Sequence, residues 1–264
     1  GNLGIAYRDL GQVDTAIGYY QEALTIAREM KDRRGEGNHL GNLGNAYSDL
    51  GQVDTAIGYY QQALTIAREI KDRGGEGNHL GNLGNALTSL GRYAEAITHI
   101  QQAITIATEI KAPSSLQYRH GFLATAYWFS GDMPNALTAI RQAREYDIAT
   151  NNHAVASLHG CIALCAGHAD EAQTAFHEAL AHADALLSKT AKQYGALYSR
   201  ALAHAGLWVV MGADADYAHA MSAYADAKAV NKAAAGVLLE NRQKLEALLR
   251  CSDRDGTALV ALLR

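Results

Sequence analysis

Asparagine side chains recur at helical spacing in two successive stretches of the sequence. In each stretch the polar residues stand four, three and four positions apart, which places them on one face of a helix. They are Asn38, Asn42, Asn45 and Asp49, then Asn78, Asn82, Asn85 and Ser89. A side-chain amide both donates and accepts hydrogen bonds, so a row of amides can hold the N–H and C=O groups of an extended peptide. This pattern predicts a surface that binds peptide backbone without demanding a particular sequence.

A structural explanation of the same asparagines stays open. Asparagine is a poor helix former, so its repeated placement inside helices needs a reason. The amides could bond to one another or to neighbouring backbone and merely order the helices. The stretch before them keeps only Asn2 and Asp9 of the set, with Ile5 between them.

Aromatic residues replace this polar row farther along the chain. Tyr118, Phe122, Trp128 and Phe129 stand at the positions that match Asn38, Asn42, Ser48 and Asp49. Large aromatics beside a polar row favour a pocket that anchors an apolar ligand side chain. The alternative is that they pack against the helices that follow. Arg92, Arg119 and His120 are candidates to assist an acidic ligand, although isolated surface charges are usually only solvated.

Signals of catalysis are weak. Cys161, Cys165 and His168 are spaced by four and three, which could bring them to one metal ion. A cysteine pair in an alanine-rich helix is more typical of packed core. His177 and His182 are five apart rather than the four of a zinc-protease helix, and no phosphate-binding glycine motif occurs. The sequence therefore predicts no enzyme, no metal and no cofactor, with a metal-dependent hydrolase as a remote alternative.

Charge and cysteine content exclude several partners. The formal net charge is −4 with acids and bases interspersed, so no basic stripe invites nucleic acid. The apolar stretches are too short to span a membrane, and no leader opens the chain. The three cysteines predict no disulfide framework and suit a reducing interior, so we expect a cytoplasmic protein.

The elements that position these residues are set by a 40-residue repeat. Residues 1–40 and 41–80 align without a gap, and 81–120 and 121–160 keep the same frame. Within a unit, Asp32 is a candidate N-cap of a helix running to about Leu50, and Gly51 supplies a tight turn. A second helix is expected over 53–70. Because neither helix buries its apolar stripe alone, neighbouring pairs must stack, which predicts an all-α solenoid.

The repeat predicts three regions. Residues 1–160 hold four regular units, the first truncated at its start because Gly1 matches Gly41 inside a helix. Residues 161–230 hold two degenerate units, marked by Gly167, Ala172, Phe176 and Ala179, then by Trp208, Gly212, Ala218 and Ala225. Residues 231–264 are expected to form capping helices, over 238–249 and after Gly256.

The regular unit resembles the tetratricopeptide repeat. The residues that carry the likeness are Leu40, Leu43, Gly44, Tyr47, Gly51, Ala56, Tyr60 and Ala63. The resemblance implies a right-handed superhelix of helix-turn-helix repeats, and the 40-residue variant is similar to kinesin light chains and GoLoco-carrying adaptors. It is also similar to the C-terminal sensor arrays of bacterial STAND NTPases.

In the light chains and adaptors, groove asparagines hold extended peptides. The resemblance thus implies a protein–protein interaction scaffold that binds a peptide or partner surface, as the sensor portion of a larger signalling protein. The alternative is a structural solenoid that stacks end to end through its open N-terminal face.

Overall fold

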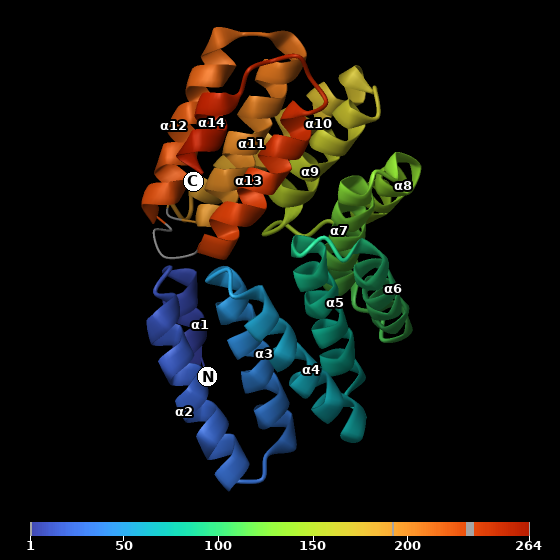
Figure 1. Ribbon diagram of the computed structural model, residues 1–264, viewed down its shortest axis with the longest axis vertical. Coiled ribbons are helices and arrows are strands. Elements are labelled where there is room, and N and C mark those ends of the chain that lie inside the picture. The colour runs from blue at the N-terminus through green and yellow to red at the C-terminus, as the bar shows by residue number, and fades with distance from the viewer. Residues whose placement is uncertain (1, 192, 231–234, 264) are drawn as a thin grey trace. The chain divides into compact units, whose positions relative to one another are not determined.

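Figure 1 shows a computed structural model of the chain, which describes residues 2–191, 193–230 and 235–263. These residues form helices joined by short turns, as the repeat predicts. The helices are α1 (Asn2–Asp9), α2 (Val13–Glu29), α3 (Arg33–Asp49), α4 (Val53–Glu69), α5 (Arg73–Ser89), α6 (Tyr93–Glu109), α7 (Pro113–Ser130), α8 (Met133–Ala143), α9 (Asn152–Cys165), α10 (Ala169–Leu187), α11 (Tyr194–Met211), α12 (Asp214–Val230), α13 (Ala235–Leu249) and α14 (Thr257–Leu262). Among the described residues, none of these helices is both long and apolar enough to cross a lipid bilayer.

The chain divides into two compact units. The first unit holds the described residues 2–126 with 235–237, and the second holds 127–230 with 238–263. Within the first unit, the successive helices α1 to α6 each pack on the next. Within the second, α9 packs on α8, α10 and α11, and α12 packs on α11 and α14. Each unit is thus a stack of helical hairpins.

The turns of the first unit follow the sequence prediction. The Asp32 side chain caps α3 by accepting a hydrogen bond from the Gly35 N–H at 2.9 Å. This cap satisfies one of the free N–H groups at the helix start. The chain then turns at Gly51, whose φ of +77° lies in the left-handed region that glycine adopts without strain. Both predicted helices of this unit are confirmed to within a residue of their expected ends.

The predicted apolar stripe of α4 forms the core against its neighbours. Ile57, Tyr60, Leu64 and Ala67 are all buried. Gly44 on α3 lets the helices approach closely, because a Cβ built there would lie 2.5 Å from the Tyr60 ring. The repeat glycine and tyrosine are therefore complementary parts of one contact.

The second unit keeps the helical hairpins, but the buried positions of α12 are shifted from those that the repeat predicts. Gly167 and Gly212 end their helices with positive φ, as expected. The prediction for α12 is wrong, because Ala218 and Ala225 are exposed. The buried residues of α12 are Ala220, Ala223, Tyr224 and Ala227, so two of them lie two positions after the expected alanines. Because α12 begins two residues after Gly212, as α4 does after Gly51, the length of the turn does not account for this shift.

The C-terminal helices close the second unit. On α13, Leu245 and Leu248 are fully buried, and Leu259 on α14 is buried as well. Both expected terminal helices are present. The fifth helical pair, α9 and α10, begins at Asn152, upstream of the expected boundary at 160.

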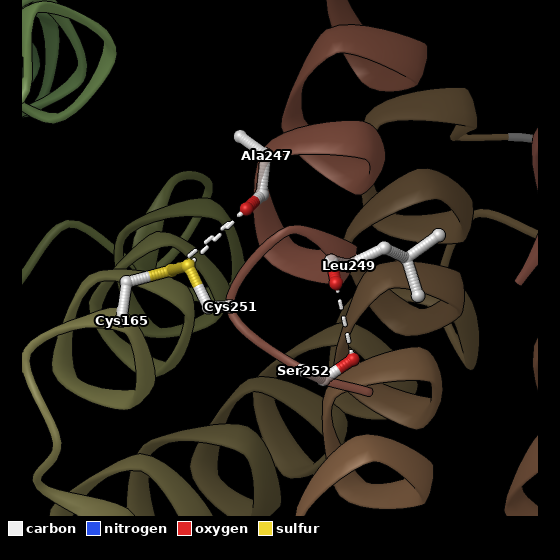
Figure 2. The surroundings of a disulfide bond; sticks show 5 residues. All are labelled: Cys165, Ala247, Leu249, Cys251 and Ser252. Carbon is white, nitrogen blue, oxygen red and sulfur yellow. Dashed lines mark hydrogen bonds between the residues drawn. A yellow bond between two sulfur atoms is a disulfide. The ribbon is translucent and has the colours of Figure 1, made fainter. Parts of the chain in front are cut away.

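The cysteines depart from the sequence prediction. Cys165, at the end of α9, forms a disulfide with Cys251, in the turn after α13, across 86 residues of sequence. Figure 2 shows the bond beside the α13 backbone, where the Cys251 Sγ lies 3.3 Å from the Ala247 carbonyl oxygen. The expectation of no disulfide is therefore wrong, because packing brings two distant cysteines together. The cysteines then give no argument for a reducing compartment.

Candidate functional site

The predicted asparagines lie on one face formed by α3 and α5. We call this the amide face and define it by Asn38, Asn42, Asn45, Asn78, Asn82 and Asn85. The side of each helix that faces away from it is apolar and buried, for example Leu40 and Leu43 on α3. Asn38 and Asn78 are exposed, and the other four are half-buried. The helical spacing thus places the amides together, as predicted.

Part of the amide face is bonded to itself. The Asn45 Oδ1 accepts hydrogen bonds from the Tyr60 hydroxyl at 2.8 Å and from the Asn82 Nδ2 at 3.0 Å. Burial raises the pKa of Tyr60 well above its usual range, so the hydroxyl remains a neutral donor. Asn45 and Asn82 consequently tie α3, α4 and α5 together, as the structural explanation of the asparagines requires.

A buried arginine extends this network. Arg119 on α7 is only 6% exposed. Its Nη2 donates to the Asn78 Oδ1 at 3.1 Å and its Nη1 to the Asn82 Oδ1 at 3.4 Å. Its guanidinium carbon also lies 5.5 Å from the Phe122 ring centroid. Burial lowers the pKa of Arg119 to about 10, so it remains charged at neutral pH.

The sequence contains a signal for this arginine that its interpretation as a surface charge missed. Arg119 stands at the same repeat position as His39 and His79. The His79 ring covers Gly41, where an added Cβ would lie 2.6 Å from the ring. Arg119 covers Gly81 in the same way, and an added Cβ there would overlap the guanidinium. Comparison at the 40-residue period therefore identifies Arg119 as a packed residue of the site.

The remaining amides are available. In the part of the chain that the structure describes, no hydrogen bond engages the side-chain amide of Asn38, Asn42 or Asn85. Asn42 lies one turn before the bonded Asn45, and Asn85 one turn after the bonded Asn82. The amide face therefore combines a fixed centre with free donors and acceptors on both helices.

The other predicted site residues separate into different places. Asn2 is exposed on α1, and the Asp49 carboxylate is engaged by the Arg8 Nε at 2.6 Å. Tyr118 is exposed and, with Phe122, belongs to the first unit. Trp128 and Phe129 belong to the second unit, where their ring centroids lie 5.2 Å apart and Trp128 is buried. The aromatic set is therefore divided between the two units, with Phe122 next to the Arg119 that bonds the amide face.

Cys161 and Cys165 lie on α9, and His168 lies in the turn before α10. Cys165 is held in the disulfide, so its sulfur is not a thiolate ligand. Cys161 is buried, and that burial raises the pKa of its thiol to about 12. His168 lies on the surface with its Nδ1 3.0 Å from a Glu171 carboxylate oxygen.

The comparisons with known proteins identify the repeat. The family described as tetratricopeptide repeat matches residues 1–69, 36–109 and 75–149, which together exceed half of the chain. The chain belongs to the tetratricopeptide repeat (TPR) family. No curated protein sequence matches this TPR chain.

Solved structures share the TPR fold at low sequence identity. One is a Rap protein complexed with Competence and Sporulation Factor, with 14% identity, a TM-score of 0.74 and coverage of 99% of this chain and 74% of that chain. Aspartyl phosphate phosphatase F from Bacillus subtilis has 15% identity and a TM-score of 0.71, and the match covers 99% of this chain and 68% of that chain. A putative kinesin light chain from Podospora anserina with nearly identical TPR-like repeats has 19% identity and a TM-score of 0.54. That match covers 72% of this chain and 94% of that chain. At these identities the likeness establishes the fold alone.

Proposed function

We propose that this TPR chain is a non-catalytic binding module that holds an extended peptide, or an extended segment of a partner protein, along the amide face. The observation that carries the proposal is the set of free amides at Asn38, Asn42 and Asn85 beside a bonded centre. A rigid centre lowers the entropy cost of binding, because the free amides are already positioned before the ligand arrives. Alternating N–H and C=O groups of an extended chain match such amides whatever the ligand's side chains.

The geometry of the stack sets the spacing of the contacts. Asn42 lies on α3 and Asn85 on α5, and these helices contact each other. Packed helices stand about 8–10 Å apart, and an extended chain advances about 3.3 Å per residue. We therefore propose that Asn42 and Asn85 bond peptide groups about three residues apart. Asn38 lies one turn before Asn42 and would contact the same strand of the ligand.

Two structurally similar proteins are consistent with this use of the fold. The Rap structure above contains Competence and Sporulation Factor. A Rap conjugation gene regulator of the plasmid pLS20, solved in complex with the Phr* peptide, matches 94% of this chain and 71% of its own with a TM-score of 0.71 and 14% identity. By analogy of fold, we propose that the chain acts as the sensor portion of a larger signalling protein.

The free amides provide the first test. A displayed library of random 12-residue peptides is selected against the chain, and the recovered peptide is titrated by calorimetry. Because each neutral hydrogen bond contributes about 0.5–1.5 kcal/mol, the variant Asn42→Ala/Asn85→Ala should weaken binding by about 1–3 kcal/mol, roughly 5- to 100-fold. Its thermal midpoint should not fall below that of the wild type, because neither side-chain amide has a partner among the described residues and alanine favours the helix.

The bonded amides provide the matched control. Asn45→Ala/Asn82→Ala removes as many amides but leaves the Tyr60 hydroxyl buried without its acceptor. This variant should lose about 1–3 kcal/mol of unfolding free energy. Failure to select any peptide, or equal peptide affinity in the wild type and the Asn42→Ala/Asn85→Ala variant, would contradict the proposed site.

Self-association through α1 is the second candidate function. Leu3 and Ile5 on α1 are 59% and 43% exposed, an unusual concentration of apolar surface on a short helix. Sedimentation velocity of the wild type should then show oligomers that Leu3→Ser/Ile5→Ser dissociates. A wild-type monomer at high micromolar concentration removes this candidate.

A further inference from the structure

A cluster of three side chains of the metal-ligating types lies in the second unit, whereas the amide face belongs to the first. His204 is on α11, and Asp216 and His219 are on α12. One ligating atom of each residue lies within 4.8 Å of the other two. The His204 Nδ1 is 3.3 Å from the Asp216 Oδ1, and the two imidazole centroids are 4.9 Å apart.

The local sequence explains this convergence. Asp216 and His219 are three residues apart, so they share one face of α12. The left-handed Gly212 ends α11 and turns the chain back, which brings that face of α12 against His204. His204 and Asp216 are partly buried, with 18% and 19% of their side chains exposed, whereas His219 is exposed. Two of the three side chains are thus partly buried between the helices, and the third lies at the surface.

The donor set selects a class of metal. Two imidazole nitrogens and one carboxylate oxygen suit divalent transition metals such as zinc, whereas magnesium and calcium prefer oxygen alone. Tetrahedral zinc with ligand bonds of about 2.0–2.2 Å places neighbouring ligand atoms roughly 3.3–3.6 Å apart. The His204 Nδ1 and the Asp216 Oδ1, at 3.3 Å, already stand at that separation, and the exposed His219 side chain can rotate to complete the set.

The charges around the cluster permit a cation. Arg200, one turn before His204 on α11, is shared with Asp184 at 3.6 Å and Asp226 at 3.9 Å. Its charge is therefore opposed by two carboxylates. Trp208, one turn after His204 on α11, and Tyr217, next to Asp216 on α12, have ring centroids 4.9 Å apart.

A second group of two histidines and one carboxylate in the same unit is already engaged by an arginine. Glu171 lies between His159 and His168, at 2.8 and 3.0 Å from their ring nitrogens. Arg141 binds both carboxylate oxygens of Glu171, at 3.0 and 2.7 Å. A guanidinium that takes both oxygens leaves no anionic ligand for a metal. The trio on α11 and α12 has no such cation within hydrogen-bond distance of its carboxylate among the described residues.

We propose that His204, Asp216 and His219 bind one zinc-class divalent ion that joins α11 to α12. Three protein ligands leave at least one coordination position of zinc to water or to a carboxylate or imidazole of a partner. The ion stabilises the second unit because it binds the folded hairpin and not the separated helices. This inference is independent of the peptide-binding proposal.

The test uses the full chain without a histidine tag and zinc as the probe. Calorimetric titration in a weakly coordinating buffer should give one zinc ion per chain, and saturating zinc should raise the thermal midpoint. Chelation should return the midpoint to its original value. His219→Ala should lose both effects and still fold, since His219 is exposed.

Two further variants keep the test decisive. Asp216→Asn retains the shape and a hydrogen-bonding side chain but removes the anionic ligand, so zinc affinity should fall at least tenfold. His177→Ala removes an exposed histidine on α10 and should bind zinc as the wild type does. Absence of zinc binding by the wild type, or equal binding by the wild type and His219→Ala, would overturn the inference.

Discussion

Replacing Phe176 with alanine is expected to lower the unfolding free energy of the second unit by about 3–5 kcal/mol. Phe176 lies on α10 and is fully buried. A Cβ added to Gly160 on α9 or to Gly206 on α11 would overlap its ring, so the ring contacts the backbone of both neighbouring helices. Alanine would leave a cavity among three helices. Because glycines line it on two sides, no side chain there can move in to fill it.

The measurement is urea unfolding followed by tryptophan fluorescence. Both tryptophans, Trp128 and Trp208, belong to the second unit, so this signal reports the unit that contains Phe176. His177→Ala, on the exposed side of the same helix, serves as control and should change stability by less than about 0.5 kcal/mol. A loss below 1 kcal/mol in Phe176→Ala would show that the ring is not the shared core contact of α9, α10 and α11.

The converse substitution tests the same contact from the other side. Gly206→Ala adds a methyl group where the Phe176 ring lies, so the ring or α11 must shift. Overpacking of this kind costs about 1–3 kcal/mol. The smaller side chain in Phe176→Leu should recover part of that loss in the double variant, which a mere helix-propensity effect would not do.

The fold was accessible from the sequence wherever the repeat is regular. Near-identical copies fix the frame, so the Asp32 cap, the Gly51 turn and the buried face of α4 followed from a single unit. The frame failed at α12, where the buried alanines lie two residues later than the repeat places them although the helix begins at the usual distance from Gly212. A periodic argument transfers only while successive units keep the same buried positions.

The candidate site was accessible in part. Helical spacing was sufficient to place the asparagines on one face. The distances of α5 and α7 from α3 determine which amides form hydrogen bonds. The residue pattern of a single helix does not predict those distances. Thus Asn45 and Asn82 are paired while Asn42 and Asn85 are free. The trio of His204, Asp216 and His219 was missed for the same reason, since two helices contribute to it.

Residue spacing could not predict the disulfide either. Its removal is the second change for which we expect a large effect. The bond joins Cys165 to Cys251 across 86 residues. It therefore encloses α10 to α13 in one covalent loop. Closing a loop of that length restricts the unfolded chain, and native disulfides typically contribute about 2–4 kcal/mol. Cys165→Ser/Cys251→Ser should lower the unfolding free energy of the second unit by that amount.

The same fluorescence-detected urea titration measures this loss, with and without reductant. Reductant should shift the wild-type midpoint toward that of the double variant and leave the double variant unchanged. The remaining thiol, Cys161, is buried and unpaired in both proteins, so it serves as an internal control for non-specific thiol effects. Mass spectrometry of the unreduced wild type should find Cys165 and Cys251 linked.

The position of the bond determines what its loss would release. Cys251 follows α13, whose Leu245 and Leu248 close the core of the second unit. Without the bond, the C-terminal helices are held by this apolar contact and by hydrogen bonds such as that from the Lys228 Nζ to the Leu262 carbonyl oxygen, so hydrogen exchange should accelerate first in α13 and α14. The double variant could instead lose global stability while hydrogen exchange in α13 and α14 stays unchanged. The disulfide would then act only by restricting the unfolded chain. If complete reduction left the urea midpoint of the wild type unchanged, the disulfide would add no stability beyond the packing of α9 against the end of α13.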